Sequence, residues 1–301
     1  MNSISTIILT YNEGKHIERC VTNAQRFSET VYLVDSFSTD DTVAIAESLG
    51  AKVYQNKWEN NHAKQFNWGL ENLPLTTDWV FRLDADEYLT DGLVNEINEK
   101  LPGLEGGISG VVFERKMYFL NKLMTKGMVQ MNMLRLFRRN QAICENRWMD
   151  EHIVLTQGTS VLFDGFFIDH NLNPLGWWID KHNNYATREA IELLNISHKI
   201  LPATNTSDTK HLMSEDAQSK RDKKEKYAGM PLFWRSFIYF VYRYFFKLGF
   251  TQGKEGFLWH FLQGWWYRTL VDAKVYEVEK ACGENVEKMK QFIRENYQIK
   301  F

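Results

Sequence analysis

Apolar positions in the first hundred residues alternate between strand-like runs and helical spacing. The runs ISTIILT (4–10) and TVYLVD (30–35) are rich in β-branched residues and typical of buried strands. The segment between them has apolar residues three or four positions apart: Ile17, Cys20, Val21, Ala24 and Phe27. Further strands at 51–55 and 78–87 flank a helix at 62–72. This alternation predicts a parallel sheet covered by helices, with ligands at the carboxyl ends of the strands.

The pattern changes after residue 100. Four strand-like runs with short connections, at 106–119, 132–139, 152–156 and 161–171, predict a mixed or antiparallel extension of the sheet. A long helix is expected from about 174 to 195. It is followed by a polar loop at 202–208, a charged helix face at 219–227 and aromatic helices at 231–276. We therefore expect one domain over 1–200, with halves at 1–100 and 101–200, and a helical C-terminal region over 201–301.

Composition narrows the classes of function. The formal net charge of -2 gives no support for nucleic-acid binding. Three cysteines without CxxC spacing fit a reducing compartment and argue against a zinc site. We find neither a signal peptide pattern nor an apolar run of the roughly 20 residues that span a bilayer. The sequence thus predicts a cytoplasmic protein without nucleic-acid partners, able at most to lie on a membrane.

Polar residues gather where the predicted strands end. The segments are LTYNEG (9–14), VDSFSTDDT (34–42), RLDADE (82–87) and RWMDEHI (147–153). Each of the first two alone is adequately explained as a helix cap or turn. Because parallel strands bring their carboxyl ends to one edge, the four together predict a ligand site.

The acids of RLDADE suggest a metal. Asp84 and Asp86 are two residues apart, so one can reach a metal ion and the other a ligand hydroxyl or a metal-bound water. Carboxylate oxygens without Cys or a His pair select Mg²⁺ or Mn²⁺. Glu87 is expected to be a solvated charge. Without a cation these acids would repel one another and leave the strand end strained or loosely ordered.

The motifs together resemble an inverting family 2 glycosyltransferase with the GT-A nucleotide-diphospho-sugar transferase fold, a mixed α/β sheet flanked by helices. The resemblance rests on TIILTYNEGKHIERCV, VYLVDSFSTDDTVAIAESLGAKV, NHAKQFNWGLENL, DWVFRLDADEYL and RLFRRNQAICENRWMDEHI. It covers roughly the first 190 residues. The C-terminal aromatic helices resemble the branch that contains lipopolysaccharide core glucosyltransferases.

The resemblance implies a nucleotide site at the first two strand ends. Thr10, Tyr11 and Glu13 are expected to contact the base and ribose, with Tyr11 against the base. Asp35 is expected to accept from the uracil ring, with Ser36 nearby. The family pattern VDxGSxDGT has glycines where this chain has Phe37 and Asp41, which predicts a stiffer loop and leaves the role of Ser38 open.

It also implies a metal-bound diphosphate. Asp84 would approach the ribose or diphosphate, and Asp86 would ligate Mn²⁺ or Mg²⁺. Lys64 stands where relatives often have a polar or basic residue near the nucleotide. His170 is either a third metal ligand or a histidine hydrogen-bonded at a strand end. The arginines of RLFRR could offset diphosphate charge: Arg135, Arg138 and Arg139.

Transfer also needs a base for the acceptor hydroxyl. Glu151 occupies the position where the family places it, and Asp150 is the alternative. Neighbours in an extended segment point opposite ways, so only one of them can face the sugar. We favour Glu151.

The C-terminal region has two interpretations. Its Trp, Tyr and Phe residues could form the core of a small helical subdomain. Alternatively, the segment 232–268 could contact an anionic membrane through aromatic residues interleaved with cations. The cations are Arg235, Arg243, Lys247, Lys254 and Arg268.

The sequence thus predicts a metal-dependent hexosyltransferase. Its donor would be a UDP-sugar, and its acceptor a glycan or lipid-linked glycan of the bacterial envelope at the cytosolic face of the inner membrane. Two rival hypotheses are a sugar nucleotidyltransferase and a non-catalytic assembly protein. The first would need a Gly-rich basic loop after strand one, and TYNEGKH is not one. The second is opposed by the intact Asp84, Asp86 and Glu151.

Overall fold

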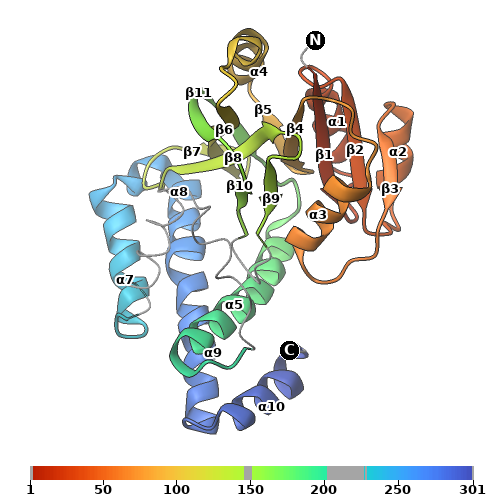
Figure 1. Ribbon diagram of the computed structural model, residues 1–301. Helices are drawn as coiled ribbons and strands as arrows, with labels where there is room; N and C mark the ends of the chain where they lie inside the picture. The colour runs from red at the N-terminus through yellow and green to blue at the C-terminus, as the bar shows by residue number, and fades with distance from the viewer. Residues whose placement is uncertain (1–2, 146–150, 202–226, 228, 300–301) are drawn as a thin grey trace. The chain divides into compact units, whose positions relative to one another are not determined.

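The computed structural model describes residues 3–145, 151–201, 227 and 229–299 (Figure 1). Contacts divide the chain into two compact units. Among the described residues, unit 1 runs to Leu123 and continues over Val129–Leu172, whereas unit 2 holds Met124–Met128 and the residues from Asn173 onward. Unit 2 therefore includes a short segment from within the sheet-forming part of the chain.

Unit 1 begins with the predicted alternation of strands and helices. Its first elements are β1 (Ile4–Thr10), α1 (Ile17–Ala24), β2 (Thr30–Asp35), α2 (Thr42–Ser48), β3 (Lys52–Gln55), α3 (His62–Asn72) and β4 (Trp79–Asp84). The strands are short and β-branched because helices cover both faces of the sheet. Ile4 and Ile8 of β1 pack with α1 in one cluster, whereas Ile7 packs with α3 in another.

The rest of unit 1 is mostly strand, with one helix. The elements are β5 (Glu87–Leu89), α4 (Asp91–Lys100), a 3₁₀ turn (Leu101–Gly103), β6 (Ile108–Phe119), β7 (Lys122–Met124), β8 (Met131–Arg138), β9 (Ala142–Cys144), β10 (Ile153–Leu155) and β11 (Thr159–Asp169). The strands predicted after residue 100 are therefore confirmed.

The described strands form a nine-stranded sheet in the order β3-β2-β1-β4-β8-β6-β11-β5, with β7 paired to β6, and a separate pair of β9 and β10. β1 runs parallel to both β2 and β4, while β8 runs antiparallel to β4 and β6. The predicted mixed sheet is confirmed. Because β1, β2 and β4 are parallel neighbours, the polar segments that follow them lie at one edge of the sheet (Figure 1).

Unit 2 is helical in its described part. Its elements are α5 (Leu175–His198), α7 (Trp234–Val241), the π-turn η3 (Tyr242–Phe246), the 3₁₀ turn η4 (Gly249–Gln252), α8 (Gly253–Trp259), the π-turn η5 (His260–Trp266), α9 (Tyr267–Cys282) and α10 (Val286–Tyr297). Its core joins Ala190 and Leu194 of α5 to Val275 of α9 and Met289 of α10. The long helix placed before residue 200 in the sequence thus packs with the C-terminal helices. The polar loop at 202–208, and the charged stretch at 219–227 except Tyr227, lie outside the described residues.

The segment Met124–Met128 begins with the last residue of β7, and residues of the later helical turns of unit 2 form hydrogen bonds with its backbone. Gly127 donates its N–H to Lys247 O (2.9 Å) and accepts from Arg243 Nε (2.6 Å). Lys126 N–H donates to Gln252 Oε1 at 2.8 Å. Gly127 has φ +69°, and a Cβ there would overlap the buried ring of His260. Glycine is therefore required at this position on two grounds, backbone conformation and space.

Of the cations predicted to face a membrane, Arg235 and Arg243 are buried inside unit 2 and Arg268 is half-buried there. Arg235 is 2% exposed and bonds Asp272 Oδ1 through Nε (2.9 Å) and Nη2 (2.5 Å). Arg243 is buried against Gly127, and the guanidinium of Arg268 lies 4.5 Å from the centre of the Tyr239 ring. Each guanidinium thus interacts with an acid, a backbone oxygen or an aromatic ring inside the unit rather than with a membrane, because an arginine removed from water requires such a partner.

Candidate active site

Two loops are joined at the carboxyl ends of β1 and β2. The backbone N–H groups of Asn12, Glu13 and Gly14 donate to the second loop, at Ser38 Oγ (2.9 Å), Thr42 Oγ1 (2.7 Å) and Asp40 Oδ2 (3.0 Å). In return, Thr39 N–H donates to Asn12 Oδ1 (2.8 Å) and Ser36 N–H donates to Thr10 O (2.9 Å). Asn12 thus ties the loops together rather than capping α1. Five hydrogen bonds hold the two loops as one rigid edge.

Asp35, the last residue of β2, connects the end of β1 to the second loop through its side chain. Its side chain is fully buried and accepts from Thr10 Oγ1 (2.9 Å) and from Ser38 through both N–H (2.9 Å) and Oγ (2.5 Å). Gln55 Nε2 lies at 3.4 Å. A carboxylate has about four acceptor positions, so the chain's own donors occupy all of them. The bond from Asp35 to a uracil ring stays a prediction and would require one of these donors to move. Ser38, whose role was open, holds Asp35 in place.

Phe37 adopts a left-handed conformation, with φ +62°. This is the first of the two positions where the family pattern has glycine. A residue with a Cβ pays roughly 1 kcal/mol or more for that backbone. At the second position, Asp41 has φ -76°, which suits any residue. The stiffer loop expected from these replacements therefore carries strain at Phe37 only.

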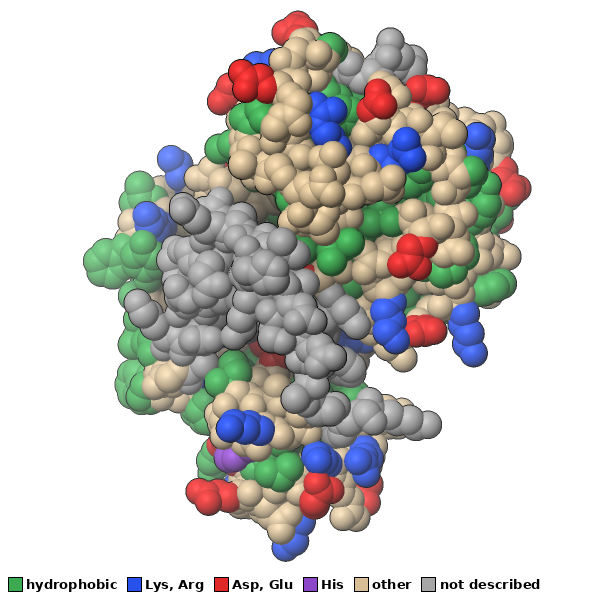
Figure 2. Space-filling model, viewed as in Figure 1, with side chains coloured by type: hydrophobic (Ala, Val, Ile, Leu, Met, Phe, Trp, Pro, Cys, Tyr) green, Lys and Arg blue, Asp and Glu red, His purple; other side chains and the backbone are tan. Residues whose placement is uncertain are grey.

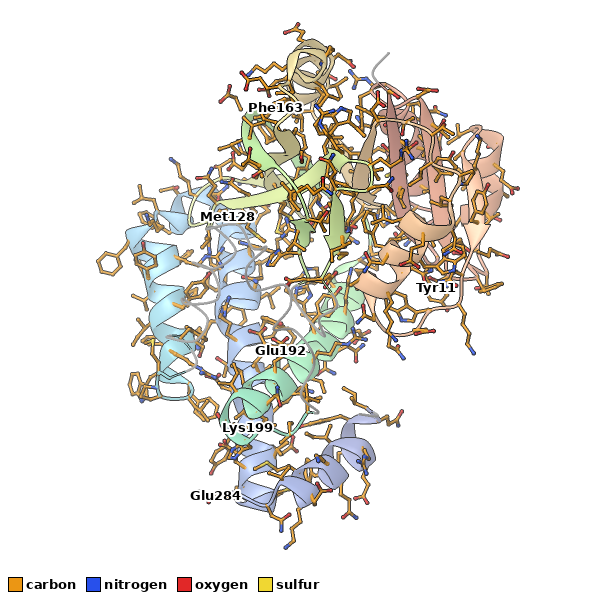
Figure 3. All side chains as sticks on the ribbon, in the orientation of Figure 1. Tyr11, Met128, Phe163, Glu192, Lys199 and Glu284 are labelled. Atoms are coloured by element: carbon orange, nitrogen blue, oxygen red, sulfur yellow. The ribbon has the colours of Figure 1, made fainter. Side chains whose placement is uncertain are left out.

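Tyr11 and Glu13 differ in exposure. The ring of Tyr11 is 59% exposed at the end of β1 (Figure 3). Glu13 instead lies with Oε2 2.6 Å from Nδ1 of the buried His16. The N–H of Leu172 donates to His16 Nε2 (2.8 Å), so Nδ1 is the nitrogen that donates to Glu13. Tyr11 is available to a ligand, whereas Glu13 also orients a histidine.

The acids after β4 are neutralised by arginines. Arg135 Nη2 lies 2.7 Å from Glu87 Oε1 and 3.2 Å from Asp84 Oδ2. Burial opposes ionisation of Asp84, but Arg135 and Arg82 outweigh it and hold its pKa well below the usual range. Burial raises the pKa of Glu87 despite the attraction of Arg135. The repulsion expected among these acids is thus relieved by the chain itself.

Two further expectations about this end of the sheet are wrong. Glu87 is 1% exposed rather than solvated, because β5 carries it into the sheet and its Oε2 accepts the N–H of Asp84 (3.0 Å). Arg138 pairs in register with Trp79, the first residue of β4, so Arg138 and Arg139 lie at the opposite end from the acids. Arg135 is the arginine of RLFRR that reaches them.

Glu151, the predicted base, is held by Arg82. Its Oε1 lies 3.4 Å from Arg82 Nη2, while Arg82 Nε lies 3.5 Å from Asp84 Oδ1. Arg82 is 7% exposed and has its guanidinium 5.4 Å from the centre of the Phe66 ring. The buried guanidinium of Arg82 therefore lies between Asp84 and Glu151 and forms an ion pair with each. Asp150 lies outside the described residues.

Asp86 lies in the turn between β4 and β5. Its backbone oxygen accepts from His170 N–H (3.0 Å) and Arg19 Nη2 (3.3 Å), and its Oδ2 accepts from Asn171 Nδ2 (2.9 Å). Arg19 of α1 also bonds His170 O at 2.7 Å. The turn that carries Asp86 is therefore fixed by the segment after β11.

His170 has partners at both ring nitrogens. Arg19 Nη1, which can only donate, lies 3.2 Å from Nδ1, so Nε2 is the nitrogen that donates to Asn121 Oδ1 (3.0 Å). Burial and the adjacent Arg19 lower its pKa. The ring also stacks on Tyr118 at 4.6 Å. Metal ligation by His170 stays a prediction and would require the ring to exchange one of these partners.

The carboxylates of Asp84 and Asp86 fit a hard divalent ion that takes most of its ligands from phosphate and water. The described residues contain no group of three or more His, Cys, Asp or Glu placed to hold a metal. No described side chain donates to Asp86 Oδ1, whereas Oδ2 is held by Asn171. Mg²⁺ and Mn²⁺ sites of this kind use one or two carboxylates and fill the remaining positions with phosphate and water. Asp86 could hold such an ion, with Asp84 beside it.

Ser36 and Lys64 flank the edge. Ser36 Oγ accepts from Gln65 Nε2 at 3.1 Å. Lys64 lies in the first turn of α3 and forms an exposed ion pair with Glu59 Oε2 (2.8 Å). Such exposed pairs contribute little stability, so Lys64 can change partners.

A cavity of about 780 Å³ in unit 1 is not part of this site. Its lining includes Ser3, Asp78 and Trp79 at the amino ends of β1 and β4, and Arg138 at the carboxyl end of the antiparallel β8. These residues lie at the opposite end of β4 from Asp84, so the cavity holds none of the acids discussed above.

Sequence reasoning missed three positioning residues: His16, Arg19 and Arg82. Arg82 could have been found, because it precedes Asp84 by two residues and therefore shares its face of the strand. His16 and Arg19 gave no such signal, since their partners Leu172 and His170 are about 150 positions away along the chain.

Comparisons with known proteins agree with this fold. The family model described as glycosyl transferase family 2 matches residues 5–168. An uncharacterized glycosyltransferase of Rickettsia felis is 43% identical over 97 residues, which are 32% of this chain and 33% of the relative. The SPbeta prophage-derived glycosyltransferase SunS of Bacillus subtilis is 31% identical over 86 residues, which are 28% of this chain and 20% of the relative. The chain thus matches about a third or less of the length of these curated relatives.

Among solved structures, mannosyltransferase PcManGT from Pyrobaculum calidifontis, in complex with GDP-Man and Mn²⁺, has the same fold. It matches with a TM-score of 0.50 and 13% sequence identity over 91% of this chain and 87% of that one. The predicted GT-A fold with a helical C-terminal region is confirmed. Since the family model covers more than half of the chain, from within β1 to within β11, the chain belongs to glycosyl transferase family 2.

Proposed function

We propose that the protein transfers a hexose from a UDP-sugar to a hydroxyl of a glycan, with inversion at the anomeric carbon. The observation that carries the proposal is the bridge made by Arg82, which holds Asp84 at 3.5 Å and Glu151 at 3.4 Å. It links an acid of the nucleotide side to a carboxylate that can take a proton. Binding and proton removal are the two tasks that a single displacement requires.

The chain's own residues would divide the work as follows. Tyr11, with Thr10 and Asp35 behind it, binds the nucleoside part of the donor. Glu151 accepts the proton of the acceptor hydroxyl as it attacks the anomeric carbon, and Arg82 orients the Glu151 carboxylate. When bound at Asp86, Mn²⁺ or Mg²⁺ would offset the charge that develops on the departing diphosphate. The Mn²⁺ in the complex of PcManGT supports this assignment.

The donor can be identified by hydrolysis of a nucleotide-sugar panel with Mn²⁺: UDP-glucose, UDP-galactose, UDP-N-acetylglucosamine and GDP-mannose. We expect slow release of UDP from one of the first two, since the proposed donor is a UDP-hexose. Preference for GDP-mannose, the ligand of PcManGT, would overturn the uridine assignment. Failure to hydrolyse or bind any member would favour a non-catalytic assembly protein, and formation of a sugar nucleotide from a nucleoside triphosphate would favour a nucleotidyltransferase.

We further propose that the acceptor is a glycan or lipid-linked glycan of the bacterial envelope, such as a lipopolysaccharide core, reached at the cytosolic face of the membrane. None of the described helices is long and apolar enough to span a bilayer. Unit 2 instead exposes an aromatic face, visible as green side chains along the edge where Figure 1 draws α7 (Figure 2). The face comprises Trp234, Phe237, Ile238, Tyr242, Phe245, Phe246, Leu248 and Phe250, each 39–76% exposed.

This aromatic face suits the interfacial region of a bilayer, where Trp, Tyr and Phe are favoured. Because Arg235, Arg243 and Arg268 are used inside the unit, only Lys247 and Lys254 of the predicted cations are exposed. We expect vesicle flotation that depends weakly on salt and is lost in Trp234→Ser/Phe246→Ser. Ile196→Ser, which changes a 52% exposed residue elsewhere in unit 2, should float normally. Absence of flotation by the unmodified protein would leave these aromatic residues as surface packing alone.

A further inference from the structure

Unit 1 exposes aromatic rings at one place. Among its described residues, Tyr11 and Phe37 are the only aromatic side chains with more than half of their surface exposed, at 59% and 53%. They follow β1 and β2, which are parallel neighbours, and lie in the two loops that five hydrogen bonds join. An exposed apolar ring beside a polar ligand edge is a feature of binding sites rather than of cores.

Both the backbone conformation and the exposure of Phe37 are unfavourable for stability. Its backbone has the left-handed φ of +62°, which glycine or asparagine would adopt more easily, and its ring is mostly in water. The loop nevertheless holds it there, because Ser38 on one side bonds Asp35 through both N–H and Oγ. Strain that the surroundings maintain at a ligand edge points to a role in binding.

We propose that Phe37 is a second contact for the nucleobase of the donor, acting with Tyr11. The inference rests on the proposed function and adds a specificity-determining residue to it. The base would lie against the rings while the diphosphate extends toward Asp84 and Asp86 at the end of the neighbouring strand β4. Because the cross-linked loops hold both residues in place, little ordering is needed when the base binds.

The state of Asp35 supports this assignment. Its carboxylate already accepts from Thr10, Ser38 and Gln55, so it is poorly placed to supply most of the base's binding energy. Contact with an aromatic ring is a large source of affinity for a base and does not depend on hydrogen bonds. Phe37 thereby replaces the glycine of the family pattern with a side chain that can touch the ligand.

The test is titration of UDP and of inorganic pyrophosphate, both with Mn²⁺, into the full-length protein and its variants. Phe37→Asn keeps a residue that tolerates the left-handed backbone, so a loosened loop does not confound the result. We expect its affinity for UDP to fall about tenfold, as loss of one ring against a base predicts. Its affinity for pyrophosphate should be unchanged, and its Tm should be equal or slightly higher, because asparagine adopts the left-handed backbone more easily. The separate variant Phe37→Tyr, which keeps an aromatic ring, should bind UDP as the unmodified protein does. Leu162→Ala, which alters another 53% exposed residue of unit 1, should have no effect on UDP affinity.

Three outcomes would contradict the inference. UDP affinity of Phe37→Asn within twofold of the unmodified protein would overturn it alone. Equal losses for UDP and pyrophosphate, with a lowered Tm, would show that Phe37 acts by holding the loop. If the unmodified protein bound pyrophosphate but neither UDP nor GDP, the proposed function would fail together with the inference.

Discussion

Glu151→Gln is expected to lower the rate of sugar transfer by about 10²–10⁴, the usual contribution of a positioned general base. The amide keeps the shape of the side chain but cannot take the acceptor's proton. Its oxygen can still accept from Arg82 Nη2, which lies 3.4 Å from Oε1 in the structure, so the donor site should be preserved. Transfer should be measured at saturating donor, and UDP binding by titration with Mn²⁺.

Asp150→Asn is the matched control for Glu151→Gln, since it removes the adjacent carboxylate that the sequence also allows. We expect Asp150→Asn to retain most of the activity. If instead Glu151→Gln turned over normally and Asp150→Asn did not, Asp150 would be the base, and the bridge from Arg82 to Glu151 would be structural.

Asp86→Ala is expected to abolish the stabilisation that Mn²⁺ and UDP together give the protein. A ligand at 100 times its Kd adds about 2.7 kcal/mol to the free energy of unfolding, which is a rise in Tm on the order of 5 °C for a chain of this size. Asp86 supplies the carboxylate with an oxygen to which no described side chain donates, so its loss should remove the ion and with it most of the diphosphate affinity. Thermal unfolding with and without both ligands provides the measurement.

Asp164→Ala is a suitable control for Asp86→Ala, because this aspartate is 95% exposed and lies on β11, outside the site. Its response to Mn²⁺ and UDP should equal that of the unmodified protein. A full thermal shift in Asp86→Ala would exclude Asp86 as the metal ligand and direct attention to Asp84.

Much of unit 1 could be predicted from the sequence because its signals are local. β-branched runs and helical spacing predict β1, β2, β3 and α3 to within a residue or two of their observed bounds. The meeting of Tyr11, Asp35 and Asp84 at one edge then followed from strand order alone, since parallel neighbours must end together.

The charge pattern of the site could not be predicted in the same way. Whether Glu87 is solvated depends on β5 pairing with β11, about 80 residues later, and on Arg135 arriving from β8. The same holds for Arg235, whose partner Asp272 is 37 positions away. Long-range partners decide whether a charged residue is buried, and neither spacing nor composition carries that information.

The segment Met124–Met128 bears on how the protein folds and how it can be divided. It is carried by the hairpin region of the sheet, yet its backbone groups are bonded by Lys247, Gln252 and Arg243. A chain shortened at residue 200 would lose all three partners, and the freed N–H and C=O groups of this segment would bond to water instead. The conformation of Met124–Met128 therefore depends on residues more than 100 positions later, and a shortened chain should lose it even where the sheet forms.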